Sequence, residues 1–170
     1  MKTKLLALAL VGLFAINGAM AQEQGDMRAG LGVVLGTKAG FDEDGEKLGF
    51  GLAPSFEYMI TDAISGAVSY DWYFKSSVGG VDINISYLNI DGRYYFMTGD
   101  TQVYGLAGLG FGMSKVSAGG GSVSDSEAGL NIGAGAVFPM SDALGINAQA
   151  KYQTAGDGQL AITAGVVYTF

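Results

Sequence analysis

Apolar side chains recur at every second position over long stretches of the chain. In the first such stretch, the intervening positions hold Arg28, Val34 and three glycines, and the apolar face carries Met27, Ala29, Leu31, Val33 and Leu35. A period of two is typical of a β-strand with one apolar face. We therefore predict a strand of about ten residues that begins at Met27.

The same alternation predicts eight strands in total, near residues 27–36, 48–58, 64–74, 83–96, 102–113, 130–138, 144–153 and 159–170. Two places disturb the pattern. Ile83 and Ile85 are out of phase with the apolar residues that follow them, which predicts a β-bulge near Tyr87 or a strand that begins later. Pro54 predicts a second bulge, because proline cannot donate a hydrogen bond to a neighbouring strand.

The connections between these strands fall into two kinds. Three are short and similar in sequence, at residues 60–64, 97–101 and 140–144, whereas the other four are mostly longer or rich in glycine and serine, near 37–47, 75–82, 114–126 and 155–158. Short turns at one end and longer loops at the other are typical of an outer-membrane β-barrel, with the short turns in the periplasm. An even number of strands places both termini at the periplasmic end.

Residues 1–21 have the pattern of a secretory signal peptide. Lys2 and Lys4 precede an apolar stretch at residues 5–16, and Ala19-Met20-Ala21 forms a small-residue cleavage site. After Gln22 no apolar run approaches the roughly 18 to 20 residues that a membrane-spanning helix needs. We expect an exported chain with one domain at residues 22–170, which enters a membrane as strands.

Composition narrows the class of protein further. Hydrophobic residues make up 49% of the chain although no long apolar run exists, so they must be dispersed, as alternation requires. The 16 acidic residues against 9 basic ones give a net charge of −7, which disfavours a nucleic-acid partner. The chain has no cysteine, so a disulfide framework cannot hold this exported domain together.

The aromatic residues indicate which face meets lipid. They lie near strand ends, where they would form two rings around an aliphatic band, with Tyr58, Tyr94, Phe96, Phe138, Tyr168 and Phe170 beside the short turns and Trp72, Phe74 and Tyr152 at the opposite ends. Interfacial aromatic rings are typical of barrels that span a bilayer. The alternative is that these rings close the ends of a soluble barrel core.

The opposite face would line the barrel. It carries equal numbers of basic and acidic residues, namely Arg28, Arg93 and Lys151 with Glu57, Asp71 and Asp91. Charges removed from water must be paired or hydrogen-bonded, and this set can neutralise itself. We predict an ion-pair network that fills the lumen, with a pair between Arg28 and Glu57 on adjacent strands.

The chain resembles the small eight-stranded outer-membrane barrels of Gram-negative bacteria, of the OmpA and OmpX type. The resemblance covers residues 22–170 and rests on residues 88–96, 104–110 and 166–170, together with the signal peptide. It implies an all-β, eight-stranded antiparallel up-and-down transmembrane barrel in contact with outer-membrane lipid and lipopolysaccharide. It also implies that Tyr168 and Phe170 form the signal read by the barrel assembly machinery. Since no residues follow Phe170, we expect the periplasmic peptidoglycan-binding domain of larger relatives to be lacking.

Candidate chemistry is sparse. Without histidine or cysteine, a Ser-His or Cys-His nucleophile and an imidazole or thiolate zinc site are excluded, and we expect no enzyme activity and no cofactor. Asp42, Asp44 and Glu46 resemble a fragment of a calcium loop but lack the distal bidentate glutamate, so we expect a solvated acidic hairpin rather than a metal site.

Three functions agree with these features. The first is a non-catalytic, monomeric outer-membrane barrel with a structural or surface-interaction role, such as adhesion or contact with a host or the envelope, through loops 37–47 and 114–126. The second is a small passive porin-like channel. The third is a soluble lipocalin-like carrier, which the lack of a C-terminal helix pattern and of a cysteine pair disfavours.

Overall fold

The computed structural model describes residues 22–170, so the predicted signal peptide at 1–21 lies outside the described residues. The described chain is built from nine strands: β1 (Met27–Asp42), β2 (Gly45–Met59), β3 (Ile64–Tyr73), β4 (Ser76–Val78), β5 (Val81–Thr98), β6 (Gln102–Ala118), β7 (Gly121–Pro139), β8 (Leu144–Gln153) and β9 (Gln159–Thr169). Residues 22–170 contain no helix long and apolar enough to cross a membrane.

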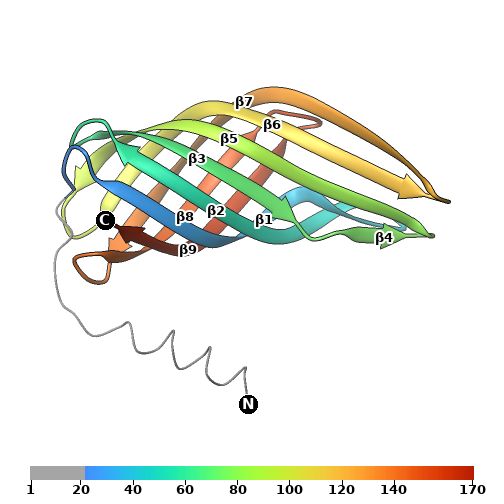
Figure 1. The fold of residues 1–170 in the computed structure, drawn as a ribbon, viewed down its shortest axis with the longest axis horizontal. Helices are drawn as coiled ribbons and strands as arrows, with labels where there is room; N and C mark the ends of the chain where they lie inside the picture. The colour runs from blue at the N-terminus through green and yellow to red at the C-terminus, as the bar shows by residue number, and fades with distance from the viewer. Residues whose placement is uncertain (1–21) are drawn as a thin grey trace, which may run out of the picture.

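The strands form one closed antiparallel barrel (Figure 1). Apart from β3 and β4, strands that are consecutive in the chain pair with each other. β1 pairs with β9, and a direct pairing of β3 with β5 completes the ring. The short β4 continues the path of β3 in the barrel wall, since it follows β3 after a two-residue break and pairs only with the start of β5. The wall therefore has eight strands, and the predicted all-β, eight-stranded up-and-down barrel is confirmed.

The three short turns lie at one end of the barrel together with Phe170, on the left in Figure 1. Two of them are closed by the same backbone hydrogen bond, from the amide of Ile60 to the carbonyl of Ile64 and from Met140 to Leu144, both 2.8 Å. The ends of the barrel chain meet there, because the Phe170 amide donates to the Met27 carbonyl at 3.0 Å. We call this the inner end and the opposite end the outer end.

Burial alternates along the strands as the sequence pattern predicts, with the apolar face outward. Ile132, Leu130 and Leu31 expose more than half of their surface, whereas intervening side chains are buried in the lumen. Two apolar clusters lie inside the barrel, one of Met59, Tyr95, Tyr104, Leu106, Val137 and Val167, and one of Val34, Ala39, Ala53, Tyr73 and Ala161 with Ile85 and Tyr87 packed against it.

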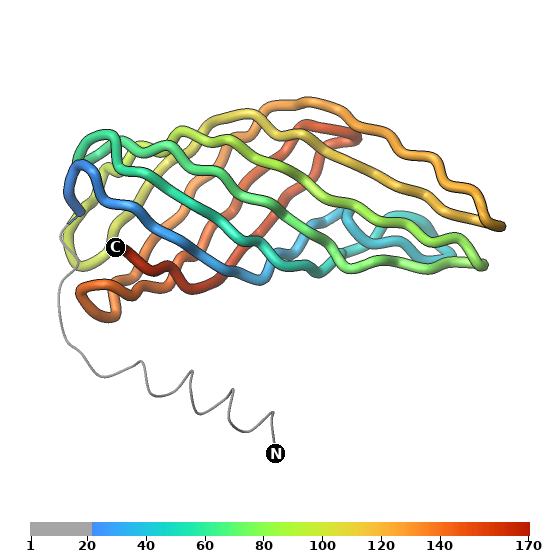
Figure 2. The backbone as a smooth tube through the Cα atoms, viewed as in Figure 1, coloured from blue at the N-terminus to red at the C-terminus, as the bar shows by residue number. Residues whose placement is uncertain are grey.

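The segments predicted as loops near 75–82 and 114–126 are tight hairpins instead, and a third hairpin lies in the acidic segment 37–47, where a hairpin was expected. The backbone trace in Figure 2 shows paired strands running on beyond the barrel wall at the outer end. Two-residue turns join Asp42 to Gly45, Val78 to Val81 and Ala118 to Gly121. Outside a bilayer no face meets lipid, so backbone pairing continues there without the alternation on which the prediction depended.

Two of these turns are built from glycine pairs. Gly79 and Gly80 have φ angles of 57° and 81°, and Gly119 and Gly120 have φ angles of 56° and 89°. Positive φ at both central residues is the requirement of a type I′ turn, whose twist matches that of the flanking strands. The glycine pairs therefore specify tight hairpins at two of the segments that were predicted as loops rich in glycine and serine.

The bulge expected at Pro54 is absent. Pro54 keeps its place opposite Leu31 in an unshifted register with β1. The pairing of β2 with β3 is interrupted between Leu52 and Ser55 and resumes in the same register. Proline thus removes a local part of the ladder without adding a residue, because its missing N–H matters on only one side of the strand.

The bulge expected near Tyr87 is also absent. β5 begins early, at Val81, and pairs with β6 without a shift as far as Tyr95. Ile85 and Tyr87 are out of phase with the lipid-facing residues because they point into the outer end of the lumen, where they cover the second apolar cluster. The register shifts lie elsewhere, between Gly36 and Gly40 in β1 and between Tyr95 and Met97 in β5.

Candidate functional site

The six charged residues predicted for the lumen all lie inside the barrel. Each exposes 7% of its surface or less, and together they come from five strands: Arg28, Glu57, Asp71, Asp91, Arg93 and Lys151. They are arranged in two groups, one nearer each end of the barrel. The lumen at this level is occupied by side chains.

The inner group is centred on the Glu57 carboxylate. Arg93 Nη1 lies 2.9 Å from Glu57 Oε2, and the Tyr95 hydroxyl donates to Oε1 at 2.7 Å. The Ser65 hydroxyl also donates to Oε1. Arg93 donates in addition to Gln149 Oε1 at 3.1 Å and stands over the Tyr104 ring, 4.6 Å from its centroid. A buried carboxylate thus receives one ionic and two neutral hydrogen bonds.

The predicted pair of Arg28 with Glu57 does not form. The two residues are direct partners in the ladder, but Arg28 Nη1 donates to the Tyr95 hydroxyl at 3.3 Å, and Glu57 is paired with Arg93. In a narrow lumen a long side chain from two strands away reaches as far as one from the adjacent strand. Strand adjacency alone therefore could not decide the partner.

The outer group shares one lysine between two carboxylates. Lys151 Nζ lies 3.4 Å from Asp91 Oδ2 and 3.8 Å from Asp71 Oδ2. Side-chain amides supply the remaining donors: Asn89 and Gln153 donate to Asp71 at 2.9 and 3.0 Å, and Asn131 donates to Asp91 at 2.8 Å. Every one of these residues is buried.

Charge is balanced across the two groups and unbalanced within each. The inner group has two guanidinium groups and one carboxylate, and the outer group has one ammonium group and two carboxylates. β5 connects the two groups, because it supplies Asp91 to the outer group and Arg93 to the inner group. Each group therefore contributes to the other's neutralisation, and the lumen as a whole carries no net charge from these residues.

The predicted lumen network did not include the tyrosines that take part in it. Tyr73, Tyr95 and Tyr104 are buried, and the Tyr104 hydroxyl donates to Asn147 Oδ1 at 2.8 Å. Tyr73 and Tyr95 alternate in phase with Asp71 and Arg93, so the pattern places them on the inward face, as observed. Tyr104 lies in the glycine-rich strand whose faces the pattern left ambiguous.

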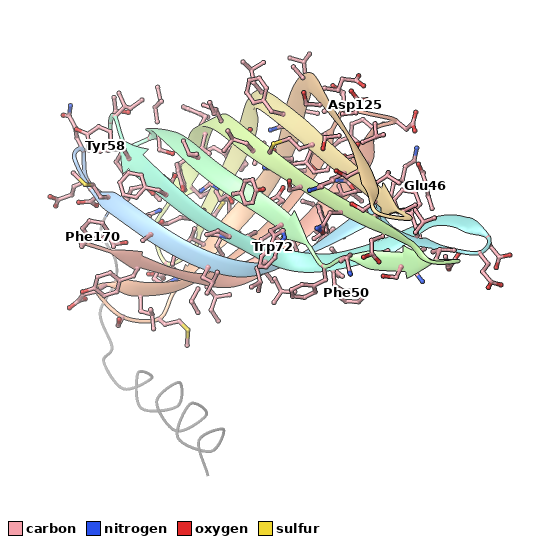
Figure 3. The ribbon with its side chains drawn as sticks, turned by 45° about the vertical axis from the view of Figure 1, so that its right-hand side comes forward. Glu46, Phe50, Tyr58, Trp72, Asp125 and Phe170 are labelled. Atoms are coloured by element: carbon pink, nitrogen blue, oxygen red, sulfur yellow. The ribbon has the colours of Figure 1, made fainter. Side chains whose placement is uncertain are left out.

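The aromatic residues predicted for the two girdles lie on the outer surface. Tyr58, Trp72, Phe74, Tyr94, Phe96, Phe138 and Tyr152 are between 44% and 59% exposed. In Figure 3, Tyr58 and Phe170 lie toward the inner end, whereas Trp72 and Phe50 lie toward the outer end. Tyr168 stacks on Phe170 with 6.3 Å between ring centroids, and Phe170 also contacts Phe56.

The outer hairpins carry exposed ion pairs. Lys47 pairs with Asp42 at 3.4 Å, and Lys75 pairs with Asp82 at 2.7 Å. Hydrogen bonds from Lys75 and Ser77 lower the pKa of the Asp82 carboxyl. Within residues 22–170 no three acidic side chains are grouped closely enough to hold a metal ion, and that includes the acidic residues of the β1–β2 hairpin.

Comparisons with known proteins agree with this geometry. The family described as outer membrane protein beta-barrel domain matches residues 6–170. Among solved structures, the attachment invasion locus protein Ail of Yersinia pestis is 23% identical, with a TM-score of 0.60 over 86% of this chain and 99% of that one. The N-terminal barrel domain of OprF from Pseudomonas aeruginosa is 21% identical, with a TM-score of 0.66 over 88% and 100%.

Neisserial surface protein A is 20% identical, with a TM-score of 0.67 over 91% of this chain and all of that one. At these identities the likenesses show a shared fold. The comparison with curated proteins gives no significant match.

Proposed function

Because this chain belongs to the family of outer membrane protein beta-barrel domains and is located in the outer membrane, we propose that it is a non-catalytic barrel with a structural and surface-interaction role. Its partners in this role are outer-membrane lipid and lipopolysaccharide around the wall and an extracellular partner at the outer hairpins. We propose further that it acts as a monomer.

The observation that carries this proposal is the exposure of the β6–β7 hairpin. β7 is exposed at every position from residue 121 to residue 128, and Val123 near the tip exposes 75% of its surface. Backbone pairing with β6 continues to the last residue pair, Ala118 with Gly121. This hairpin is ordered and exposes both of its faces beyond the barrel wall. Such a surface favours a role in contact with another molecule over a role as a channel.

The filled lumen argues against the channel alternative. The pairs of Arg93 with Glu57 and of Lys151 with Asp91 fill the barrel interior, and the removal of these charges from water is compensated only while the pairs persist. The soluble carrier does not agree with location in the outer membrane, and the buried charges do not suit an apolar ligand.

Relatives support contact with the outside in general terms. The name of Ail refers to attachment and invasion, and Ail has been crystallised with the heparin analogue sucrose octasulfate. The net charge of −7 of the present chain disfavours such a polyanion. The partner proposed here is therefore not a sulfated sugar.

The same proposal assigns the C-terminal strand to biogenesis. Tyr168 and Phe170 both face outward beside the inner end and stack on each other. Their exposure leaves them accessible to an assembly factor before lipid covers the wall. We assign them as the signal for the barrel assembly machinery.

The surface role can be tested by shortening one hairpin at a time. Removing residues 115–118 and 121–124 leaves Gly119-Gly120 as the turn between Ser114 and Asp125, which are already partners. The matched control removes residues 77–78 and 81–82 and leaves Gly79-Gly80 between the partners Ser76 and Ile83. Both variants keep a tight glycine turn on an intact barrel.

Cells that carry each variant are compared for attachment to a panel of protein-coated and uncoated surfaces. We expect the β6–β7 variant to lose attachment and the β4–β5 control to keep it. Equal attachment of both variants and of the full chain contradicts the surface role. Stable open steps of the purified barrel in planar bilayers contradict the filled lumen and favour the channel.

A further inference from the structure

A cavity of about 510 Å³ lies at the outer end of the barrel. It is bounded by the β1–β2 hairpin, the β6–β7 hairpin, the inward face of β5 and the turn at residues 156–158. Its size is within the range usual for small-molecule sites. Glu46 on β2 and Asp125 on β7, both on its lining, are labelled at the outer end in Figure 3.

The lining is strongly acidic. Four carboxylates, those of Glu46, Asp125, Glu127 and Asp157, face one ammonium group, that of Lys38. Lys38 is committed to Glu46 at 3.8 Å and to the Asp157 carbonyl at 3.0 Å. Among the described residues, the carboxylates of Glu127 and Asp157 have no hydrogen-bond or ion-pair partner. A ligand that enters this cavity therefore meets uncompensated negative charge.

Gln159 is a second, independent observation that points to a ligand. It lines the cavity and is 2% exposed, and its amide nitrogen donates to Gln153 Oε1 at 3.0 Å. Its own Oε1 is buried and has no hydrogen-bond partner within the described residues. A buried acceptor without a donor is unfavourable, and a donor-only group such as an ammonium satisfies it.

One wall of the cavity is apolar. Phe41, Ile85 and Tyr87 line it, and the Tyr87 ring offers a face to a cation as well as to methylene groups. Gly112 keeps the space beside that ring open, since a Cβ there would lie 2.9 Å from Tyr87 Cε1. The site therefore combines carboxylates with an aliphatic surface.

The spacing of the carboxylates decides the kind of cation. Within residues 22–170 they do not form a group of three that could hold a metal ion, so a compact divalent ion is disfavoured. Separated carboxylates next to an apolar wall match ammonium groups joined by methylene segments. We propose that the cavity binds an extended aliphatic polyamine, with its ammonium groups on Glu127 and Asp157 and at Gln159 Oε1, and its methylenes on the apolar wall.

The test is titration calorimetry of spermidine into the full barrel in nanodiscs of zwitterionic lipid, which adds no anionic lipid to compete for the probe. We expect saturable one-to-one binding that weakens as salt is added. The double variant Glu127→Gln and Asp157→Asn should bind spermidine about fivefold to tenfold more weakly, because two exposed ionic contacts are lost.

The matched control is Glu43→Gln with Asp44→Asn. It makes the same change in charge at the tip of the β1–β2 hairpin, outside the cavity lining, and should leave the affinity within about twofold. Butylamine, with one ammonium group, should bind much more weakly than spermidine. All the substituted side chains are exposed, so both variants should keep the gel mobility of the folded barrel.

Absence of saturable spermidine binding overturns the proposal. An equal loss in the cavity variant and the tip variant also overturns it, because general attraction to an acidic surface would then explain the binding. The result is independent of the attachment test, since shortening the β6–β7 hairpin keeps Asp125, Glu127 and Asp157 in place.

Discussion

Two lysines illustrate how burial determines the contribution of an ion pair to the free energy of unfolding. Lys151 is 1% exposed and is shared by Asp71 and Asp91, whereas Lys75 is about half exposed and pairs with Asp82 on a hairpin. Breaking a buried pair leaves uncompensated charge in a medium of low dielectric constant. An exposed pair is replaced by water at little cost.

We therefore expect Lys151→Met to lower the free energy of unfolding by about 3–5 kcal/mol. The matched variant Lys75→Met should change it by less than about 1 kcal/mol. Urea unfolding of the barrel in lipid vesicles, followed by tryptophan fluorescence, measures both. Equal effects of the two substitutions would show that the lumen charges are hydrated and that the lumen is not filled.

Phe170 provides a second prediction at the residue scale. If Tyr168 and Phe170 form the assembly signal, Phe170→Ser should strongly reduce the amount of barrel in the outer membrane of cells and should change spontaneous refolding into vesicles only slightly. Phe74→Ser is the control, since Phe74 is similarly exposed at the other end of the barrel. Quantitative blotting of membrane fractions compares the two, and equal levels would remove the special role of the C-terminal residue.

At the scale of elements, the hairpins depend on two-residue turns. Gly119 and Gly120 both have positive φ, whereas the neighbouring Gly121 does not. A side chain at a left-handed position costs about 1–2 kcal/mol, because Cβ approaches the following carbonyl oxygen. The turn is thus the least replaceable part of a hairpin whose side chains are almost all exposed.

The double variant Gly119→Ala and Gly120→Ala should open the β6–β7 hairpin without unfolding the barrel. Hydrogen exchange should become faster at residues 114–126 and stay slow in the parts of β6 and β7 that lie within the wall. Gly121→Ala is the control and should be neutral, because the nearest atom to the added Cβ is the Ala118 carbonyl oxygen at 3.8 Å. Unchanged exchange in the double variant would contradict a turn-dependent hairpin.

At the scale of the whole molecule, stability comes from closure. The pairing of β1 with β9 extends over nine residue pairs from Arg28 to Gly36, so the wall has no free edge between the first and last strands. In a bilayer the backbone groups cannot hydrogen-bond to water, and a closed ladder is the way for strands to satisfy them. Opening the barrel therefore exposes many unpaired groups at once.

This cooperativity predicts that the barrel resists detergent until it is heated. Unheated protein in sodium dodecyl sulfate should migrate at a different position from boiled protein in gel electrophoresis, because the unheated barrel stays compact. The three single variants at Lys75, Phe74 and Gly121 should keep this shift. Identical mobility of heated and unheated wild-type protein would contradict a closed, bilayer-stabilised wall.

The same distinction of scale explains which features could be predicted from the sequence. The number of strands and the separation of an apolar face from a face that carries the six charges follow from alternation, because the sides of a strand are fixed by a period of two. The aromatic residues at the strand ends then indicate that the apolar face points outward. The pairing of those charges does not follow. Glu57 accepts from Arg93, Ser65 and Tyr95, which come from two other strands, and only closure of the barrel decides their distances.

The outer end shows the limit of the pattern most clearly. Ile85 breaks the alternation because it covers the top of the lumen, and the hairpins beyond it have no lipid to impose a pattern. The sequence by itself determined a closed, lipid-facing wall, since apolar side chains for the bilayer alternate with small or polar side chains for the interior along each strand. Only the tertiary structure decided the ion partners, the hairpins and the acidic cavity, because these depend on contacts between residues that are distant in the chain.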